Sequence, residues 1–413
     1  MTSRIRILLL TQWFDPEPTF KGIVFARELV RQDFDVEVVT GFPNYPGGKV
    51  YPNYRIKLLQ RELIDGVELS RVPLYPSHDQ GAVGRVANYV SFALAALIYC
   101  LFSAKKPAVI YVYHPPLTVA LAAVLVGFFR RVPVVCDIQD MWPDTLRATG
   151  MIENPRALAA VSVVCSWVYR RATHLVVLSP GFKRLLEQRG VPDEKVDVIY
   201  NWADEASLAC PKGILPANFP GTAYFRIVFA GNIGKAQALH HVLDAAVLLQ
   251  SRASRVCFVF LGGGVEVSRL KGQAQALGLS NVVFLSSVPM VEVGTILKAA
   301  DVLLVHLRKD PLFRVTIPSK TQAYLAAGKP ILMAVDGEAA DLVNRANCGV
   351  IAESENAEAI CSAAESLAQL STVQLAELGK RAHTYYQEVL ALRIGVAKFG
   401  TIFNRLALSA QRK

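Results

Sequence analysis

Short apolar runs alternate with helical patterns along the whole chain, and this alternation constrains the fold more than any other feature. In the first half the runs are Ile5–Leu10, Val36–Thr40, Val67–Val72, Val109–Tyr113, Val132–Asp137, Leu175–Leu178 and Val196–Tyr200. The second half repeats the pattern with Ile227–Ala230, Val256–Leu261, Val282–Leu285, Val302–Val305, Ile331–Val335 and Val350–Ala352. Such runs are typical of buried strands in a parallel, doubly wound sheet. We therefore predict an α/β chain with two Rossmann-like domains in tandem and a cleft between them.

The domain boundaries follow from length and composition. A chain of 413 residues is longer than a single hydrophobic core usually supports. Residues 202–222 lack periodicity and contain Pro211, Pro216 and Pro220, so we interpret them as a linker. We predict one Rossmann-like domain over 1–201, a second over 223–385, and C-terminal helices over 386–413 that pack back towards the first domain.

Charge and cysteine content narrow the class of protein. The formal net charge of +10 favours anionic partners, but it does not choose between nucleotide, nucleic acid and acidic lipid. The 7 cysteines are scattered without CxxC spacing, which indicates reduced cytoplasmic thiols rather than disulfides or a zinc site. The start of the chain has no cleavage site after its first apolar run, so we expect no signal peptide.

Two common nucleotide-binding motifs are missing from the sequence. The first strand runs into TQWFDPEPTFKG without GxGxxG, and Gly262-Gly263-Gly264 lacks the third spaced glycine. There is also no GxxxxGK[ST] motif. These absences argue against a nicotinamide or flavin enzyme and against a P-loop NTPase.

Two helix starts in the second half are candidate anion sites. The strand Ile227–Ala230 leads through Gly231-Asn232-Ile233-Gly234 to Lys235 and a helical pattern, while Pro318-Ser319-Lys320 opens another helix beside Arg314. Backbone N–H groups and the positive dipole end at a helix start attract anions. The two starts could hold a diphosphate between them without a metal ion. The alternatives are an ordinary βα turn at the first site and a solvated basic loop at the second.

Polar residues of catalytic type follow three strands of the first half. Tyr113-His114 ends one strand, the segment from Asp137 through Asp140 to Asp144 follows the next, and Asp15 and Lys21-Gly22 follow the first. Ligands of open α/β sheets lie beyond the carboxyl ends of the strands. We therefore expect a site there, although a lone histidine at a strand end is most often structural.

Two segments of the first half are unusually apolar. Tyr89–Ala104 lies between Arg85 and Lys105-Lys106, and Leu117–Phe129 is followed by Arg130-Arg131. Both are shorter than the ~20 residues that a membrane-spanning helix needs. We expect Leu117–Phe129 to be a buried helix. Tyr89–Ala104 is either buried too or seated in the interface of an anionic membrane, which would make the protein peripheral on the inner face of the cytoplasmic membrane.

Motifs spread over essentially the whole chain resemble those of retaining GT-B glycosyltransferases of family 4, closest to the bacterial branch that builds O-antigen, capsule and exopolysaccharide. In the second half these are AGNIGKAQ, FLSSVP and IPSKTQAYLAAGKPIL. In the first half they are LLLTQWFDPEPTFKG, FPNYPGGKVYPNY, YVYHPP, DIQDMWPDTL, VLSPGFK and IYNWADE, in the family's order. Each motif alone is weak, but the ordered series is specific.

The resemblance implies a GT-B fold and a set of site residues. It implies that the cleft histidine His114 touches the transferred sugar, with Asp140 as a candidate contact to the acceptor. Acceptor binding by the first domain would involve Asp15, Lys21 and Tyr113. The donor-binding residues would be Gly22, Gly231, Asn232, Lys235, Ser287, Val288, Arg314, Ser319, Lys320 and Gln322.

One departure concerns the ExxxxxxxE motif, whose second glutamate holds the ribose in the wider family. The two glutamate positions fall at Val315 and Ala323, so both carboxylates are missing. Gln322 or a residue on another loop would then take over the ribose.

The resemblance implies a retaining, metal-independent enzyme without a cofactor, which moves a sugar from a UDP-sugar to an acceptor. We expect the sugar to be an N-acetylated aminosugar and the acceptor to be a polyprenyl-diphosphate-linked saccharide. Fixed cations and helix N-termini would stabilise the departing phosphate. The predicted partners are the donor, the acceptor and an anionic membrane surface, but not nucleic acid. A UDP-sugar 2-epimerase and a non-catalytic subunit of a polysaccharide assembly complex remain alternatives.

Overall fold

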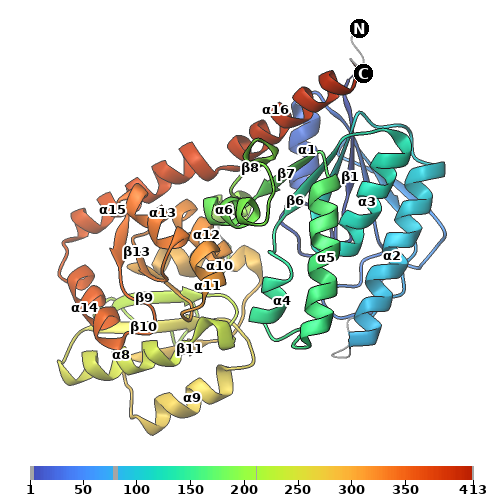
Figure 1. Ribbon diagram of the computed structural model, residues 1–413. Helices are drawn as coiled ribbons and strands as arrows, with labels where there is room; N and C mark the ends of the chain where they lie inside the picture. Colours follow the sequence, from blue (N-terminus) through green and yellow to red (C-terminus); the bar gives the residue numbers. More distant parts are fainter. Residues whose placement is uncertain (1–3, 78–81, 211, 412–413) are drawn as a thin grey trace. The chain divides into compact units, whose positions relative to one another are not determined.

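The computed structural model describes residues 4–77, 82–210 and 212–411. The chain forms two compact units, each built around its own sheet (Figure 1). Unit 1 comprises Met1–Tyr200 together with Arg393–Lys413, and unit 2 comprises Asn201–Leu392.

The sheet of unit 1 is 8-stranded, with the order β3-β4-β2-β1-β5-β6-β7-β8. All neighbouring strands are parallel except β3 and β4, which are antiparallel. The strands are β1 (Arg6–Leu10), β2 (Asp35–Thr40), β3 (Gln60–Ile64), β4 (Val67–Arg71), β5 (Val109–His114), β6 (Val134–Ile138), β7 (His174–Val177) and β8 (Val196–Val198). The strand β3 is absent from the sequence prediction, because this edge strand is only half-buried and carries no apolar run.

The helices of unit 1 are α1 (Ile23–Arg31), α2 (Ala82–Phe102), α3 (Leu117–Arg130), α4 (Asp144–Ala148), α5 (Pro155–Arg171), α6 (Pro180–Gln188), η1 (Asp193–Lys195) and α16 (Leu392–Gln411). Local sequence explains several of their starts. Ser179 accepts a hydrogen bond from the N–H of Phe182, and Asn154 accepts one from the N–H of Arg156; each precedes a proline in the first turn.

The sheet of unit 2 is 6-stranded and parallel, with the order β11-β10-β9-β12-β13-β14. Its strands are β9 (Phe225–Ala230), β10 (Val256–Leu261), β11 (Val282–Leu285), β12 (Val302–His306), β13 (Ile331–Ala334) and β14 (Gly349–Ile351). Its helices are α7 (Glu205–Ala209), η2 (Lys235–Gln237), α8 (His240–Ser251), α9 (Val267–Ala276), α10 (Met290–Ala299), α11 (Pro311–Val315), α12 (Ser319–Ala326), α13 (Glu338–Ala346), α14 (Ala357–Ala368), α15 (Thr372–Tyr385) and the π-helix η3 (Tyr386–Leu390). Every strand predicted in this half is present.

The segment predicted as a linker has structure of its own. Within 202–222, α7 packs against α10, and the Glu205 carboxylate accepts hydrogen bonds from the Tyr386 hydroxyl and the Leu392 N–H. These contacts join the start of unit 2 to its end, and the segment is therefore part of unit 2.

The last helix, α16, packs on unit 1 through aromatic side chains. The Phe399 ring lies 5.3 Å from the ring of Phe25 and 5.5 Å from that of Tyr111, and the Phe403 ring lies 6.0 Å from that of Phe34. The chain therefore ends in the unit in which it begins, as Figure 1 shows.

The apolar segment around Tyr89 is longer in the structure than the sequence analysis supposed. Among the described residues, one helical stretch, Val83–Phe102, is long and apolar enough by length and composition to cross a membrane, and 33% of it is buried. The expectation that this segment is too short was wrong, because the helix begins before Tyr89. The helix α2 packs against α3, and its Phe92, Ala96 and Cys100 are buried. The same helix exposes other apolar residues at a spacing of three or four, namely Val83, Val86, Val90, Leu94, Ile98 and Phe102.

Candidate functional site

In unit 2, Lys320 lies in the first turn of α12 with its ammonium buried. The residue as a whole is half-buried, but Nζ has no hydrogen-bond partner among the described residues. Nζ lies 3.6 Å from the centre of the Phe229 ring, which presents its negative face to the cation. Burial lowers the pKa of Lys320 to about 7. A buried cation without a counter-ion is costly, so this site is suited to an anion from outside the protein.

Glycine residues let the backbone approach this lysine. Gly231 has a φ of +137°, and a Cβ there would lie 3.6 Å from Lys320 Nζ. A Cβ at Gly262 would lie 1.9 Å from the Gly231 carbonyl oxygen, so only glycine fits between the ends of β9 and β10. The Tyr324 hydroxyl, one turn further along α12, donates to the Ala230 carbonyl and accepts from its N–H at 2.8 Å, which fixes α12 against β9.

The glycine turn itself is not an open cradle of N–H groups, and this part of the prediction was wrong. The N–H groups of Gly231, Ile233 and Gly234 donate to Leu261 O, Gly263 O and Gln237 Oε1, respectively. These three N–H groups therefore form hydrogen bonds within the protein, two of them to residues at or after the end of β10. The cation of Lys320 and the N-terminus of α12 are therefore the stronger anion-binding features here.

The structure brings further predicted donor residues to the same strand ends. A Cβ at Gly264 would lie 2.8 Å from Asn232 Oδ1, and one at Gly263 would lie 3.0 Å from Ser287 Oγ. The glycine run 262–264, which the sequence analysis considered only as a dinucleotide motif, is thus part of this site. Its compact packing depends on contacts between three strand ends, and no single motif reveals such contacts.

The remaining donor residues differ in exposure. Lys235, Arg314 and Ser319 are exposed, and Val288 is half-buried. Gln322 is 1% exposed, and its amide nitrogen can donate at 2.9 Å to the carbonyls of Pro318 and Ser319. The amide nitrogen of Gln322 thus serves the first turn of its own helix, and the expectation that Gln322 holds a ribose stays a prediction.

In unit 1, His114 is the last residue of β5, and Asp140 follows the neighbouring strand β6. The His114 carbonyl accepts a hydrogen bond from the Gln139 N–H at 2.8 Å, which holds the two strand ends together. The His114 ring is 0% exposed, contacts Trp142 edge-on at 5.8 Å, and has no partner for either nitrogen among the described residues. Burial lowers the pKa of His114 to about 4, so its imidazole is neutral near pH 7. Trp142 covers a ring that the resemblance predicted to be accessible to a sugar.

The Asp140 carboxyl shares this environment. Burial raises the pKa of Asp140 to about 6. Burial also raises the pKa of Tyr113, and the charges of Asp137 and Asp140 add to that shift. Tyr113 was predicted to contact the acceptor, but its side chain is buried in this structure. A carboxyl group that titrates near pH 6 can act as a proton acceptor at neutral pH.

Asp15 and Gly22 form a helix cap. The Asp15 carboxylate accepts a hydrogen bond from the Ile23 N–H at 2.6 Å, and a Cβ at Gly22 would lie 2.1 Å from Asp15 Oδ2. The start of α1 therefore already carries an internal anion. In this structure the two residues serve each other in the cap, and the expected roles of Asp15 in acceptor binding and of Gly22 in donor binding stay predictions.

Lys21 is 2% exposed and is therefore not a surface cation, while its contact with an acceptor stays a prediction. Its ammonium lies 5.2 Å from the centre of the Phe399 ring. Burial lowers the pKa of Lys21 to about 8, although the buried Asp137 carboxylate opposes this shift. Asp137 in turn accepts hydrogen bonds from the Tyr111 hydroxyl at 2.5 Å and from the Gln139 amide at 2.6 Å. The group is a buried polar network that supports the sheet.

We expect Lys21→Met to lower the free energy of unfolding by about 3 kcal/mol, because it leaves the Asp137 charge buried without its cation. Urea denaturation of the single variants Lys21→Met and Asp137→Asn and of the double variant measures this coupling. The double variant should be more stable than Lys21→Met alone. Additive losses in the three variants would contradict an electrostatic link between the two residues.

Comparison with known proteins agrees with the architecture of both units. Residues 24–202 match the family model described as glycosyl transferase 4-like domain, and residues 217–384 match glycosyl transferases group 1. The chain is 27% identical over 246 residues to WbjE of Pseudomonas aeruginosa, named as a glycosyltransferase, and this match spans 57% of each chain. It is 26% identical over 341 residues to WcaI of Escherichia coli K12, named as a colanic acid biosynthesis glycosyl transferase, covering 78% of this chain and 82% of the relative.

Among solved structures, the chain is similar to Anabaena Alr3699/HepE with a TM-score of 0.69 and 15% identity, covering 97% of this chain and 100% of that one. The sheet orders, the two family matches and this likeness define a glycosyltransferase of GT-B fold. Within that class, the chain belongs to the family 4 type, as the resemblance in the sequence predicted.

Proposed function

We propose that this glycosyltransferase moves a sugar, an N-acetylated aminosugar by preference, from a UDP-linked donor to a lipid-linked saccharide in the synthesis of a bacterial surface polysaccharide. WcaI is named for colanic acid biosynthesis, and HepE was solved in complex with UDP and glucose. These relatives support the choice of a nucleotide sugar and a polysaccharide. The reaction is proposed to retain the anomeric configuration and to need no metal.

The observation that carries the proposal is the buried, unpartnered ammonium of Lys320 at the start of α12. A diphosphate would supply the counter-ion that this cation lacks, and its binding would raise the lowered pKa of Lys320. Negative charge develops on the leaving phosphate during transfer, so a fixed cation stabilises the transition state more than the ground state. Asn232 and Ser287 lie at the same strand ends and are proposed to contact the remainder of the donor.

A transfer assay with UDP-sugars and a polyprenyl-diphosphate-linked saccharide tests the proposal. Formation of an extended lipid-linked product supports it, whereas formation of a C2-epimeric sugar nucleotide would indicate an epimerase. Donor binding without either product would indicate a non-catalytic subunit. We expect transfer to persist in excess EDTA, because the proposed anion site uses an ammonium and backbone dipoles. Loss of activity on chelation, restored by Mg²⁺ or Mn²⁺, would contradict the metal-independent mechanism.

We further propose that the enzyme works as a peripheral protein on the cytoplasmic face of an anionic membrane, bound through α2. The exposed apolar stripe from Val83 to Phe102 supports this, as do the exposed rings of Phe128 and Phe129 at the end of α3. Arg130 joins the ends of the two helices by donating to the carbonyls of Cys100 and Ala104 at 2.7 and 3.0 Å. Arg130 is thus structural, so Lys106 and Arg131, which are exposed, are the better candidates for lipid contact.

The membrane proposal predicts a graded loss of vesicle binding. Lys106→Gln with Arg131→Gln should weaken binding to anionic vesicles by about 30-fold, since each cation contributes about 1 kcal/mol. Leu94→Gln with Ile98→Gln should remove the salt-resistant part of binding, which comes from apolar insertion. Sedimentation with anionic and neutral vesicles at low and high salt measures both effects. Lys298→Gln with Lys380→Gln, two exposed lysines of unit 2, is the matched charge control. Equal losses in test and control variants would contradict a specific membrane face.

A further inference from the structure

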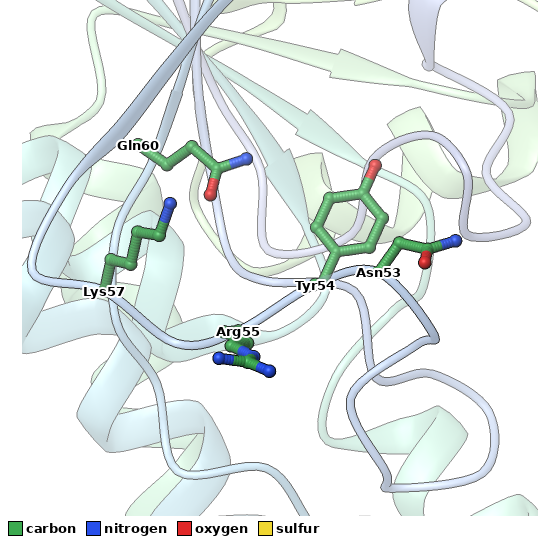
Figure 2. A pocket seen from close by; sticks show the side chains of 5 residues that line it. All are labelled: Asn53, Tyr54, Arg55, Lys57 and Gln60. Atoms are coloured by element: carbon green, nitrogen blue, oxygen red, sulfur yellow. The ribbon is translucent and has the colours of Figure 1, made fainter.

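A polar hollow in unit 1 lies outside the residues assigned so far. Asn53, Tyr54, Arg55, Lys57 and Gln60 line it, and its volume is about 350 Å³. Four of these residues precede β3, and Gln60 is the first residue of this strand at the edge of the sheet. Figure 2 shows their side chains, with the Lys57 ammonium directed towards Gln60.

Buried contacts hold one wall of this hollow in place. The Tyr54 ring lies over the guanidinium of Arg71 at 5.0 Å. Arg71 is fully buried and donates to the Gly41 carbonyl at 3.1 Å and to the Glu62 carboxylate at 3.2 Å. Glu62 also accepts a hydrogen bond from the Gln60 amide at 2.8 Å. The aromatic wall and the amide are therefore positioned before any ligand arrives.

The two cations of the hollow, Arg55 and Lys57, have no ion-pair partner among the described residues. Many other surface cations of this chain, in contrast, are paired with carboxylates. Two free cations that line one hollow are suited to an anion with more than one negative charge.

Exposed apolar side chains belong to the same segment of the chain as the lining residues. The sequence from Arg55 alternates cations with aliphatic residues, and Ile56, Leu58, Leu59 and Leu63 are all exposed. Leu58 is 90% exposed, which is unusual for a leucine and costs free energy in water. A ligand with an anionic head and a hydrocarbon chain would use both features together.

We propose that this hollow binds the diphosphate of a prenyl diphosphate, with the first isoprene units lying on Leu58, which directly follows Lys57 in the chain. Two cations match a diphosphate better than the single charge of a phospholipid headgroup. On the proposed function, this ligand is the diphosphate end of the lipid-linked acceptor, and the site selects acceptors that carry a lipid diphosphate.

The test is titration calorimetry with farnesyl diphosphate, inorganic pyrophosphate and farnesol on the full chain. Arg55→Gln with Lys57→Gln should weaken farnesyl diphosphate binding by at least about tenfold for each cation. Leu58→Ser should weaken farnesyl diphosphate binding but leave pyrophosphate binding unchanged. Lys49→Gln with Arg156→Gln removes the same charge from exposed positions outside the hollow, and binding should be unchanged.

The same titrations on the Lys320→Met variant distinguish binding at the hollow from binding at the proposed donor site. In Lys320→Met, farnesyl diphosphate should still bind and should still depend on Arg55 and Lys57. If binding is lost in Lys320→Met but kept in Arg55→Gln with Lys57→Gln, the diphosphate occupies the donor site and the inference is wrong, while the proposed function stands. If the Lys49 and Arg156 control loses as much farnesyl diphosphate affinity as the Arg55 and Lys57 variant, the effect comes from the net charge of the protein. That result would also overturn the inference. If the hollow variant loses binding to phosphatidylglycerol vesicles but not to farnesyl diphosphate, the hollow is a headgroup site, and the inference is again wrong.

Discussion

Lys320→Met is expected to lower the rate of sugar transfer by about 10²–10³-fold and to make the folded protein more stable. The rate falls because the variant removes a desolvated cation from the proposed diphosphate site. Stability rises by about 1–2 kcal/mol, because methionine fills a similar space beside Phe229 without burying an unpartnered ammonium. A lysine with a purely structural role would show the opposite change in stability.

The gain in stability should depend on pH. Burial lowers the pKa of Lys320 to about 7 in the folded protein, below its ordinary value. Between pH 7 and about 10 the unfolded chain binds the extra proton, so wild-type stability rises with pH over this range. Methionine does not titrate, so the advantage of Lys320→Met should be largest below pH 7 and should shrink towards pH 10. Thermal denaturation from pH 6 to 9 measures this change.

Donor affinity should also depend on the titration of Lys320, but it should fall with rising pH where the stability of the protein rises. The diphosphate favours the charged lysine, so donor affinity should fall as the pH rises above about 7. If Asp140, whose pKa is raised to about 6, must be ionised, kcat/KM should also fall below pH 6. Lys298→Met, at an exposed lysine of the same unit, serves as the control and should change neither stability nor rate. Transfer at the wild-type rate in Lys320→Met would refute the donor assignment.

His114→Phe is the second variant with a large expected effect, a loss of transfer of about 10²-fold without loss of stability. Both ring nitrogens of His114 lack partners among the described residues, and a buried polar group without a hydrogen bond costs free energy. Phenylalanine keeps the edge contact with Trp142 and removes this cost. Transfer assays and thermal denaturation on the same preparation separate the two effects.

A second buried histidine provides the control for His114→Phe. His174 pairs with the Asp197 carboxylate at 2.8 Å, so His174→Phe should lose stability and keep its rate per folded molecule. In acid, wild-type stability should fall between pH 6.5 and about 4, where the unfolded chain protonates His114 and the folded chain does not. His114→Phe should lack this part of the acid loss. A variant that transfers sugar normally would leave His114 as a packing residue only.

Lys320 and His114 share a physical property that explains why they are informative. Each is a polar group that burial has stripped of water and that no described residue satisfies. Native proteins satisfy the great majority of such groups, so those that remain unsatisfied point to a function. Lys21 shows the contrast, since its buried charge faces Asp137 within the protein and its role is structural.

The sequence by itself determined every strand except β3, and it determined the edge of each sheet at which the site residues lie. Every predicted strand is present, from β1 to β14, because an apolar run bounded by turn residues is a local signal. The sequence also placed Gly231, Asn232, Ser287 and Lys320 at strand or helix ends, and the structure brings them together around the carboxyl ends of β9, β10 and β11.

Only the tertiary structure decided which polar residues are available to a ligand. Asp15 and Lys21 look like surface charges in the sequence, but one caps α1 and the other lies beneath Phe399 of the returning helix α16. The Gln322 amide can donate to carbonyls at the start of its own helix. The N–H groups of Gly231 and Ile233 in the glycine turn donate to the carbonyls of Leu261 and Gly263. The edge strand β3 is held in the sheet by its antiparallel pairing with β4. It follows the segment that supplies most of the lining of the polar hollow. Burial and partnership depend on segments far apart in the chain, and for this reason local patterns could not predict them.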